Sequence, residues 1–177
     1  TRPGDVVLVE SPTYHLGLRI LRDHHLDLRA VPVDVHGLRV DALEATLAGL
    51  QREGKKPRLL YTIPTFHNPT GVNLAMDRRQ AVVDLAARHG FLVLEDDVYR
   101  ELAYDGAAPP SLFGLAPRGT VMRMGSFAKS LAPGLRLGWW DCSAEQAHRC
   151  ADGGLRDSGG APNFAAAMMV ASLCRSG

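Results

Sequence analysis

Lysine is scarce in this chain of 177 residues. Lys55 and Lys56 lie side by side in a polar stretch, and Lys129 is the only other lysine, so arginine carries nearly all of the positive charge. Lys129 stands in the run Gly-Ser-Phe-Ala-Lys-Ser-Leu-Ala-Pro-Gly, which begins at Gly125. A lysine usually lies on the solvated surface. Arg stays protonated and cannot replace Lys where a neutral amine must attack a carbonyl, so the setting of Lys129 invites a chemical explanation.

The chain also lacks an excess charge of one sign, a cysteine motif and a long apolar run. Its net charge of +1 gives no electrostatic case for nucleic acid or an anionic membrane as a partner. No apolar stretch is long enough to span a bilayer, and the first residues do not resemble a signal peptide. Cys142, Cys150 and Cys174 have no CxxC or zinc spacing, so we predict no metal site and reduced thiols in a cytoplasmic protein.

An apolar fraction of 46% and a charged fraction of 22% are typical of a globular protein with one substantial core. The apolar pattern predicts strands at residues 6–9, 28–33, 58–63, 91–94, 121–124 and 137–140, and helices at residues 14–23, 41–50, 77–89, 143–151 and 163–176. Asp41 is the expected N-cap of the second helix, and Gly90 is the expected C-cap of the third. This alternation predicts an α/β fold in which helices flank a mostly parallel sheet in three layers, α/β/α.

Polar residues follow several of the predicted strands, and ligands of such sheets bind beyond the carboxyl ends of the strands. Asn68 lies in Asn-Pro-Thr-Gly, which is either a turn or the source of an amide donor for a ligand. Asp96 ends an apolar strand, with Tyr99 three residues later. Its carboxylate either caps a helix or faces a protonated ring nitrogen.

Ser126 and Arg136 flank Lys129. A hydroxyl and a guanidinium suit a phosphate dianion, but they could equally form a helix cap and a structural salt bridge. Tyr14 follows the first strand and is either a core aromatic or a ring that stacks on a ligand. Together these groups match the needs of pyridoxal 5′-phosphate, which uses a Lys Schiff base and an acidic partner for its pyridine nitrogen.

The order and spacing of these motifs resemble those of the fold-type I class I/II aminotransferases. Within that family, the sequence around Lys129 is most similar to the aminoadipate and aromatic aminotransferase branch. The resemblance rests on Pro3-Gly4-Asp5, Glu10-Ser11-Pro12-Thr13-Tyr14, Asn68-Pro69-Thr70-Gly71, Asp96-x-x-Tyr99 and Ser126-x-x-Lys129 with Arg136 seven residues on. It implies a pyridoxal-phosphate-dependent enzyme that moves an amino group between an amino acid and a 2-oxo acid. It also implies a homodimer.

The resemblance implies a role for each matching residue. Lys129 would form the Schiff base and move the proton between the substrate α-carbon and the cofactor C4′. Asp96 would pair with the pyridine nitrogen, and Asn68 and Tyr99 would hydrogen-bond the phenolic oxygen of the cofactor.

The remaining implied roles concern the cofactor's phosphate and ring. Ser126 and Arg136 would hold the phosphate, and Tyr14 would stack on the ring. Residue 128 is Ala, where this branch often has a second hydroxyl, so one phosphate hydrogen bond is expected to be missing. Residues 1–177 would form the large, cofactor-binding domain, and the family's preceding N-terminal segment and following small domain are not in this sequence.

Two alternatives remain open. The same residues would serve other pyridoxal-phosphate chemistry on an amino acid, as in a lyase, a decarboxylase or an oxidase. They would also serve a cofactor-sensing domain of a transcriptional regulator, which resembles an aminotransferase and carries a DNA-binding helix-turn-helix. The run from Glu95 to Tyr99, Glu-Asp-Asp-Val-Tyr, favours the enzymes, because the regulators usually place Tyr directly after Glu-Asp-Asp.

Overall fold

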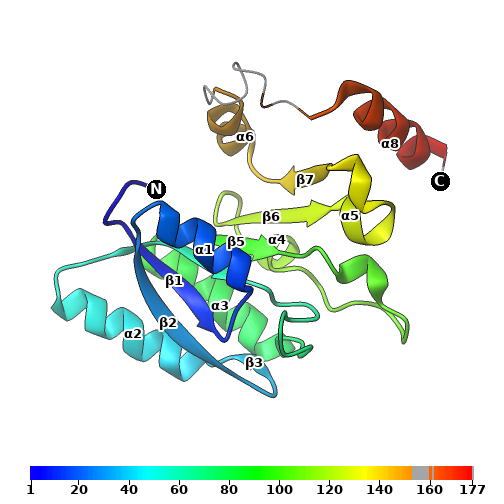
Figure 1. Cartoon of the computed structure of the whole chain (residues 1–177). Helices are drawn as coiled ribbons and strands as arrows, with labels where there is room; N and C mark the ends of the chain where they lie inside the picture. The colour runs from blue at the N-terminus through cyan, green and yellow to red at the C-terminus, as the bar shows by residue number, and fades with distance from the viewer. Residues whose placement is uncertain (153–159, 161, 177) are drawn as a thin grey trace.

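A seven-stranded sheet organises the computed structural model, which describes residues 1–152, 160 and 162–176 (Figure 1). The strand order is β3-β2-β1-β4-β5-β6-β7. The strands are β1 (Val6–Ser11), β2 (Asp27–Asp34), β3 (Gly37–Leu38), β4 (Pro57–Thr62), β5 (Leu92–Asp96), β6 (Val121–Ser126) and β7 (Gly138–Asp141). The central pairs are parallel, and only the edge strands β3 and β7 run antiparallel. The predicted, mostly parallel α/β sheet is confirmed, although β3 was not predicted.

The helices vary widely in length. They are α1 (His15–Asp23), α2 (Val40–Arg52), α3 (Met76–His89), α4 (Leu112–Leu115), α5 (Phe127–Ser130), α6 (Ala144–Ala151) and α8 (Phe164–Ser176), with 3-10 turns η1 (Arg100–Leu102) and η2 (Pro133–Leu135). The five longer α-helices were predicted, and α4, α5 and both 3-10 turns were not. Gly90 is the C-cap of α3 as predicted, with a left-handed φ of 70° that suits glycine.

The prediction for Asp41 is wrong. Arg39 is the N-cap of α2, and Asp41 lies inside the first turn, where its side chain pairs with Arg39. A carboxylate in the first turn is favoured by the helix dipole, much as an N-cap is favoured by its hydrogen bond. An aspartate in the sequence therefore fits both the N-cap and the first turn, and its residue type does not tell which of the two it occupies.

The two faces of the sheet are covered differently (Figure 1). On one face, α2, α3 and α4 bury a large core that includes Leu8, Leu60, Val93 and Val121. The other face, here called the α1 face, buries a smaller cluster: Val7, Val9, Leu59, Tyr61 and Ile63. Because side chains alternate along a strand, Asp96 shares the α1 face with Leu92 and Leu94.

Helix α8 and the residue before β7 form a third, small apolar cluster. Ala166 and Val170 of α8 pack with Leu137, while Phe164 and Met169 of the same helix stay exposed. Among the residues described, no helix combines the length and the apolar character that a membrane span requires.

Candidate active site

Three segments that follow neighbouring strands bring three of the predicted residues together. Asn68 follows β4, Tyr99 follows β5, and Lys129 follows β6. The side-chain Nδ2 of Asn68 donates a hydrogen bond of 3.3 Å to the Tyr99 hydroxyl. The Lys129 Nζ lies 5.7 Å from the centroid of the Tyr99 ring, within the range of a cation–π contact. The carboxyl edge of the parallel strands therefore gathers an amide, a phenol and an amine, as expected.

Lys129 lies on the short helix α5, where a loop was expected, and its side chain is exposed. Ser126 caps this helix, because its Oγ accepts a hydrogen bond from the Ala128 N–H. The same Oγ donates to the Leu137 carbonyl oxygen at 3.4 Å. The capping interpretation of Ser126 is confirmed, and it fixes the start of α5 at Phe127, two residues before Lys129. A role toward a phosphate stays a prediction.

Asp96 is buried on the α1 face, with 6% of its surface exposed. Its Oδ2 accepts a hydrogen bond of 2.7 Å from the Tyr61 hydroxyl. Its Oδ1 is buried and has no hydrogen-bond partner among the described residues. Burial raises the pKa of Asp96, although the hydrogen bonds from Tyr61 and the Val98 N–H oppose that rise. Tyr99, and not Asp96, occupies the N-cap of the next helical turn, so the capping alternative for Asp96 is wrong.

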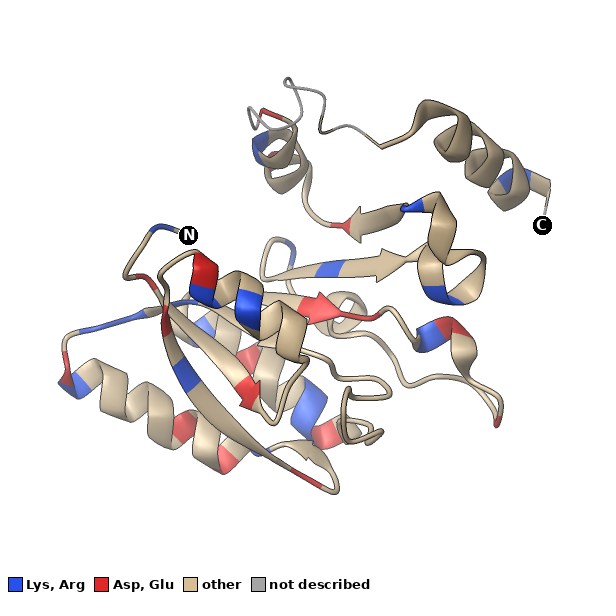
Figure 2. Cartoon of the chain, in the orientation of Figure 1, with Lys and Arg blue, Asp and Glu red and all other residues tan. Residues whose placement is uncertain are grey.

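The acids on either side of Asp96 have structural partners (Figure 2 shows acidic residues in red at the end of β5). Glu95 accepts hydrogen bonds of 2.9 Å from the N–H groups of Leu112 and Phe113, which start α4. Asp97 pairs through Oδ2 with the guanidinium groups of Arg100 and Arg123. Asp97 Oδ1 also lacks a partner within the described part of the chain, but the two arginines compensate its charge.

A buried cluster of Glu10 and His67 was missed in the sequence. The Glu10 carboxylate accepts hydrogen bonds from the Thr62 hydroxyl at 2.7 Å and the Ile63 N–H at 2.8 Å. The His67 Nε2 lies 3.2 Å from Glu10 Oε2, and both side chains are almost fully buried. An acid that directly follows the apolar run of β1 was the available signal. The cluster joins the ends of β1 and β4, which lead into Tyr14 and Asn68.

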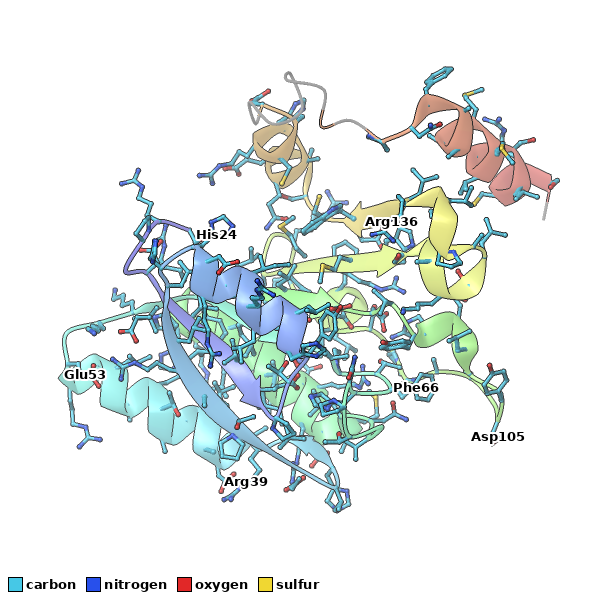
Figure 3. The ribbon with its side chains drawn as sticks, in the orientation of Figure 1. His24, Arg39, Glu53, Phe66, Asp105 and Arg136 are labelled. Carbon is cyan, nitrogen blue, oxygen red and sulfur yellow. The ribbon has the colours of Figure 1, made fainter. Side chains whose placement is uncertain are left out.

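Tyr14 and Arg136 make contacts of their own. Tyr14 is the N-cap residue of α1, and its half-buried ring packs against the α1-face cluster without belonging to the buried core. Arg136 is exposed, and its NH1 donates to the Pro133 carbonyl oxygen at 3.3 Å (Figure 3 labels Arg136). Within the described residues it forms no salt bridge. Ring stacking by Tyr14 and phosphate binding by Arg136 stay predictions.

A pocket of about 570 Å³ opens beside the Asn68–Tyr99 hydrogen bond. The residues that line it come from the loops after β4 and β5: Phe66, His67, Asn68, Pro69, Gly71, Tyr99, Leu102, Tyr104 and Asp105. Lys129 and Asp96 do not line this pocket. It therefore adjoins the candidate site and provides room for a small ligand next to Tyr99.

Residues 1–176 match the family model described as Aminotransferase class I and II. Over 137 residues the chain is 41% identical to Aromatic-amino-acid aminotransferase 1 of Thermococcus litoralis, covering 77% of this chain and 33% of that protein. It is 34% identical to the uncharacterized HTH-type transcriptional regulator YisV of Bacillus subtilis, covering 76% of this chain and 27% of that protein.

A solved structure is similar as well. The kynurenine aminotransferase of Pyrococcus horikoshii, solved in complex with PMP, KYN as substrates and KYA as products, superposes with a TM-score of 0.76 at 42% identity. The match covers 78% of this chain and 34% of that one. The chain thus spans about a third of the length of these relatives.

Proposed function

The chain belongs to the class I and II aminotransferase family, and we propose that the protein containing it is a pyridoxal 5′-phosphate-dependent aminotransferase. It would move an amino group between an amino acid and a 2-oxo acid, with the cofactor attached to Lys129. The observation that carries this proposal is the meeting of Lys129, Tyr99 and Asn68 at the carboxyl edge of the sheet, where β5 ends in Asp96, a buried acid with one oxygen unpartnered in the described chain.

The donor and acceptor chemistry of these residues fits the cofactor. A buried carboxylate needs a partner for each oxygen, and a protonated pyridine N–H would provide one for Asp96 Oδ1. Such a positive charge would also lower the pKa of Asp96, against the effect of its burial. When bound, pyridoxal phosphate supplies the electron sink for the reaction at the substrate α-carbon.

The remaining chemistry belongs to side chains of this protein. We assign Lys129 Nζ to move the proton between the substrate α-carbon and the cofactor C4′ carbon. Tyr99 accepts a hydrogen bond from Asn68 and keeps its own hydroxyl proton to donate. Both side chains could therefore hydrogen-bond the phenolic oxygen of the cofactor.

Tyr14, Ser126 and Arg136 complete the proposed cofactor site. The Arg136 guanidinium has only one carbonyl hydrogen bond in the described residues, which leaves most of its donors for a phosphate. Ser126 would contribute its hydroxyl, and the Tyr14 ring would stack on the pyridine. We further propose a cytoplasmic homodimer. The free thiols of Cys142 and Cys150 are compatible with a reducing compartment.

A second candidate function is cofactor sensing by a transcriptional regulator. The similarity to YisV favours it, because that relative is named as an HTH-type regulator. Both candidates use the same cofactor site, so they differ in turnover and not in cofactor attachment. Other pyridoxal-phosphate reactions on an amino acid would differ from transamination in needing no 2-oxo acid acceptor.

Borohydride reduction of the complete protein with bound pyridoxal phosphate tests these proposals. We expect peptide mass spectrometry to find the reduced cofactor on Lys129, with Lys55 and Lys56 as unmodified internal controls. Amino donors should then be consumed only with a 2-oxo acid acceptor. An unmodified Lys129 would overturn the proposal. Attachment at Lys129 without turnover would favour the regulator, and turnover without an acceptor would favour a different reaction.

A further inference from the structure

We propose that Tyr61 is a positioning residue that keeps Asp96 ionised and holds its Oδ1 toward the cofactor's ring nitrogen; this inference rests on the proposed function. The Tyr61 hydroxyl donates a hydrogen bond of 2.7 Å to Asp96 Oδ2. Both residues are buried, with 4% and 6% of their surfaces exposed. The hydrogen bond occupies one carboxylate oxygen and leaves Oδ1 as the acceptor for a ring N–H.

The sheet fixes the relative position of the two side chains. Tyr61 lies on β4 opposite Leu94 of β5, and Asp96 follows Leu94 by two residues on the same face. A long aromatic side chain can reach this diagonal neighbour. Both residues lie on paired central strands, so the hydrogen bond is built on rigid elements, as a precise binding site requires.

Helix α1 closes over the Tyr61 hydroxyl from the other side. A Cβ atom at Gly17 of α1 would lie 3.1 Å from the hydroxyl oxygen of Tyr61, a tighter approach than packed side chains usually make. Glycine at this position therefore lets the helix backbone approach the phenol. The hydroxyl is held between the sheet and α1 and is screened from water.

The negative charge of Asp96 explains why a tyrosine suits position 61. Burial and the neighbouring Asp96 raise the pKa of Tyr61, so the phenol stays neutral and donates its proton. A neutral donor stabilises the carboxylate without cancelling its charge. The like charges of Asp97 and Glu10 both oppose the ionisation of Asp96. The hydroxyl of Tyr61 and the Val98 N–H favour the charged form of Asp96 before the cofactor binds.

The expected consequence is a change in the proton affinity of the bound ring. Tyr61→Phe removes the hydroxyl and so destabilises the ionised form of Asp96. A less stable carboxylate in turn gives less support to the protonated form of the ring nitrogen. A hydrogen bond to a charged group has an energy that corresponds to about a tenfold change in proton affinity. The complete protein loaded with cofactor ¹⁵N-labelled at the ring nitrogen, without substrate, reports this directly by the ¹⁵N chemical shift over a pH titration.

We expect the ring nitrogen of Tyr61→Phe to lose its proton at a lower pH than that of the wild type. Asp96→Asn should show a still larger change. Thr46→Val is the matched control, because it removes a hydroxyl that donates 2.8 Å to the Ala42 carbonyl oxygen within α2, across the sheet from Asp96. It should keep the wild-type titration.

The outcomes separate the two proposals. If the wild type shows no bound, protonated ring nitrogen, the proposed function fails and takes this inference with it. If the wild type shows one and Tyr61→Phe titrates as the wild type and Thr46→Val do, the role of Tyr61 is wrong while the proposed function stands. Unbound cofactor is removed before the titration, so the signal comes from the loaded fraction and reduced occupancy of a variant does not hide the answer.

Discussion

The two faces of the sheet differ in how completely they are covered. Among the described residues, the large core under α2, α3 and α4 contains 17 buried apolar residues, whereas the apolar cluster of the α1 face contains five. Helix α1 itself has no buried residue, and it leaves Ile20 exposed. The proposed cofactor residues Asp96 and Tyr14 lie on the thinly covered α1 face. The large core therefore supplies most of the apolar burial, and the α1 face carries two of the proposed cofactor residues.

The largest effect on function is expected from Lys129→Ala, which removes the proposed cofactor attachment and leaves the large core intact. We expect cofactor attachment to be lost and turnover to fall on the order of 10⁴-fold, because the variant lacks both the amine that binds the aldehyde and the base. The melting temperature without cofactor should not change, since the side chain is exposed. Lys55→Ala is the control and should keep wild-type turnover. Absorbance and steady-state kinetics measure both effects, and a retained cofactor band in Lys129→Ala would reject its assignment.

The large core should respond in the opposite way. Leu60 is fully buried on that face, so Leu60→Ala should lower the free energy of unfolding by about 4 kcal/mol through lost burial and a cavity. Leu16→Ala on α1 is the matched control, and it should cost less than about 1 kcal/mol because 43% of Leu16 is exposed. Urea unfolding of the complete protein measures both. Equal losses would contradict the difference between the faces.

Two consecutive acids, Asp96 and Asp97, differ in the same way: one is proposed to bind the cofactor and the other stabilises the fold. Asp97 is structural, because its carboxylate is fully buried between Arg100 and Arg123. Asp97→Asn removes the negative charge from this network and should destabilise the protein by about 3 kcal/mol. Calorimetry of the cofactor-free protein measures the loss. A variant as stable as the wild type would show that the arginines do not depend on Asp97.

Asp96→Asn should have the smallest effect on stability and the opposite sign. Burial raises the pKa of Asp96, so the folded protein holds a proton that the unfolded chain releases above the ordinary aspartate pKa of 3.8. The wild type therefore loses stability as the pH rises from that value through the raised pKa, and Asn does not titrate. Without cofactor, we expect Asp96→Asn to be slightly more stable at neutral pH, with the difference closing in acid. A difference that grows in acid would contradict the raised pKa.

The longer elements could be predicted because their apolar periods extend over many residues, as in α3 with Val82, Val83 and Leu85 buried. The two-residue strand β3 and the four-residue helix α5 are too short to show a period. Asp41 was misplaced because a carboxylate favours both the N-cap and the first turn of a helix.

The meeting of Asn68, Tyr99 and Lys129 could be predicted because residues after parallel strands share one edge of the sheet. The hydrogen bond from Tyr61 to Asp96 could not, because it depends on the register between β4 and β5. Sequence patterns leave strand boundaries uncertain by a few residues, and a slip of one residue moves a side chain to the other face.

A crystal structure of the complete protein with pyridoxal phosphate tests the central claim most directly. We expect continuous electron density between Lys129 Nζ and the cofactor, with the ring nitrogen within hydrogen-bonding distance of Asp96 Oδ1. A cofactor bound elsewhere, or a ring nitrogen that faces a group other than Asp96, would contradict it.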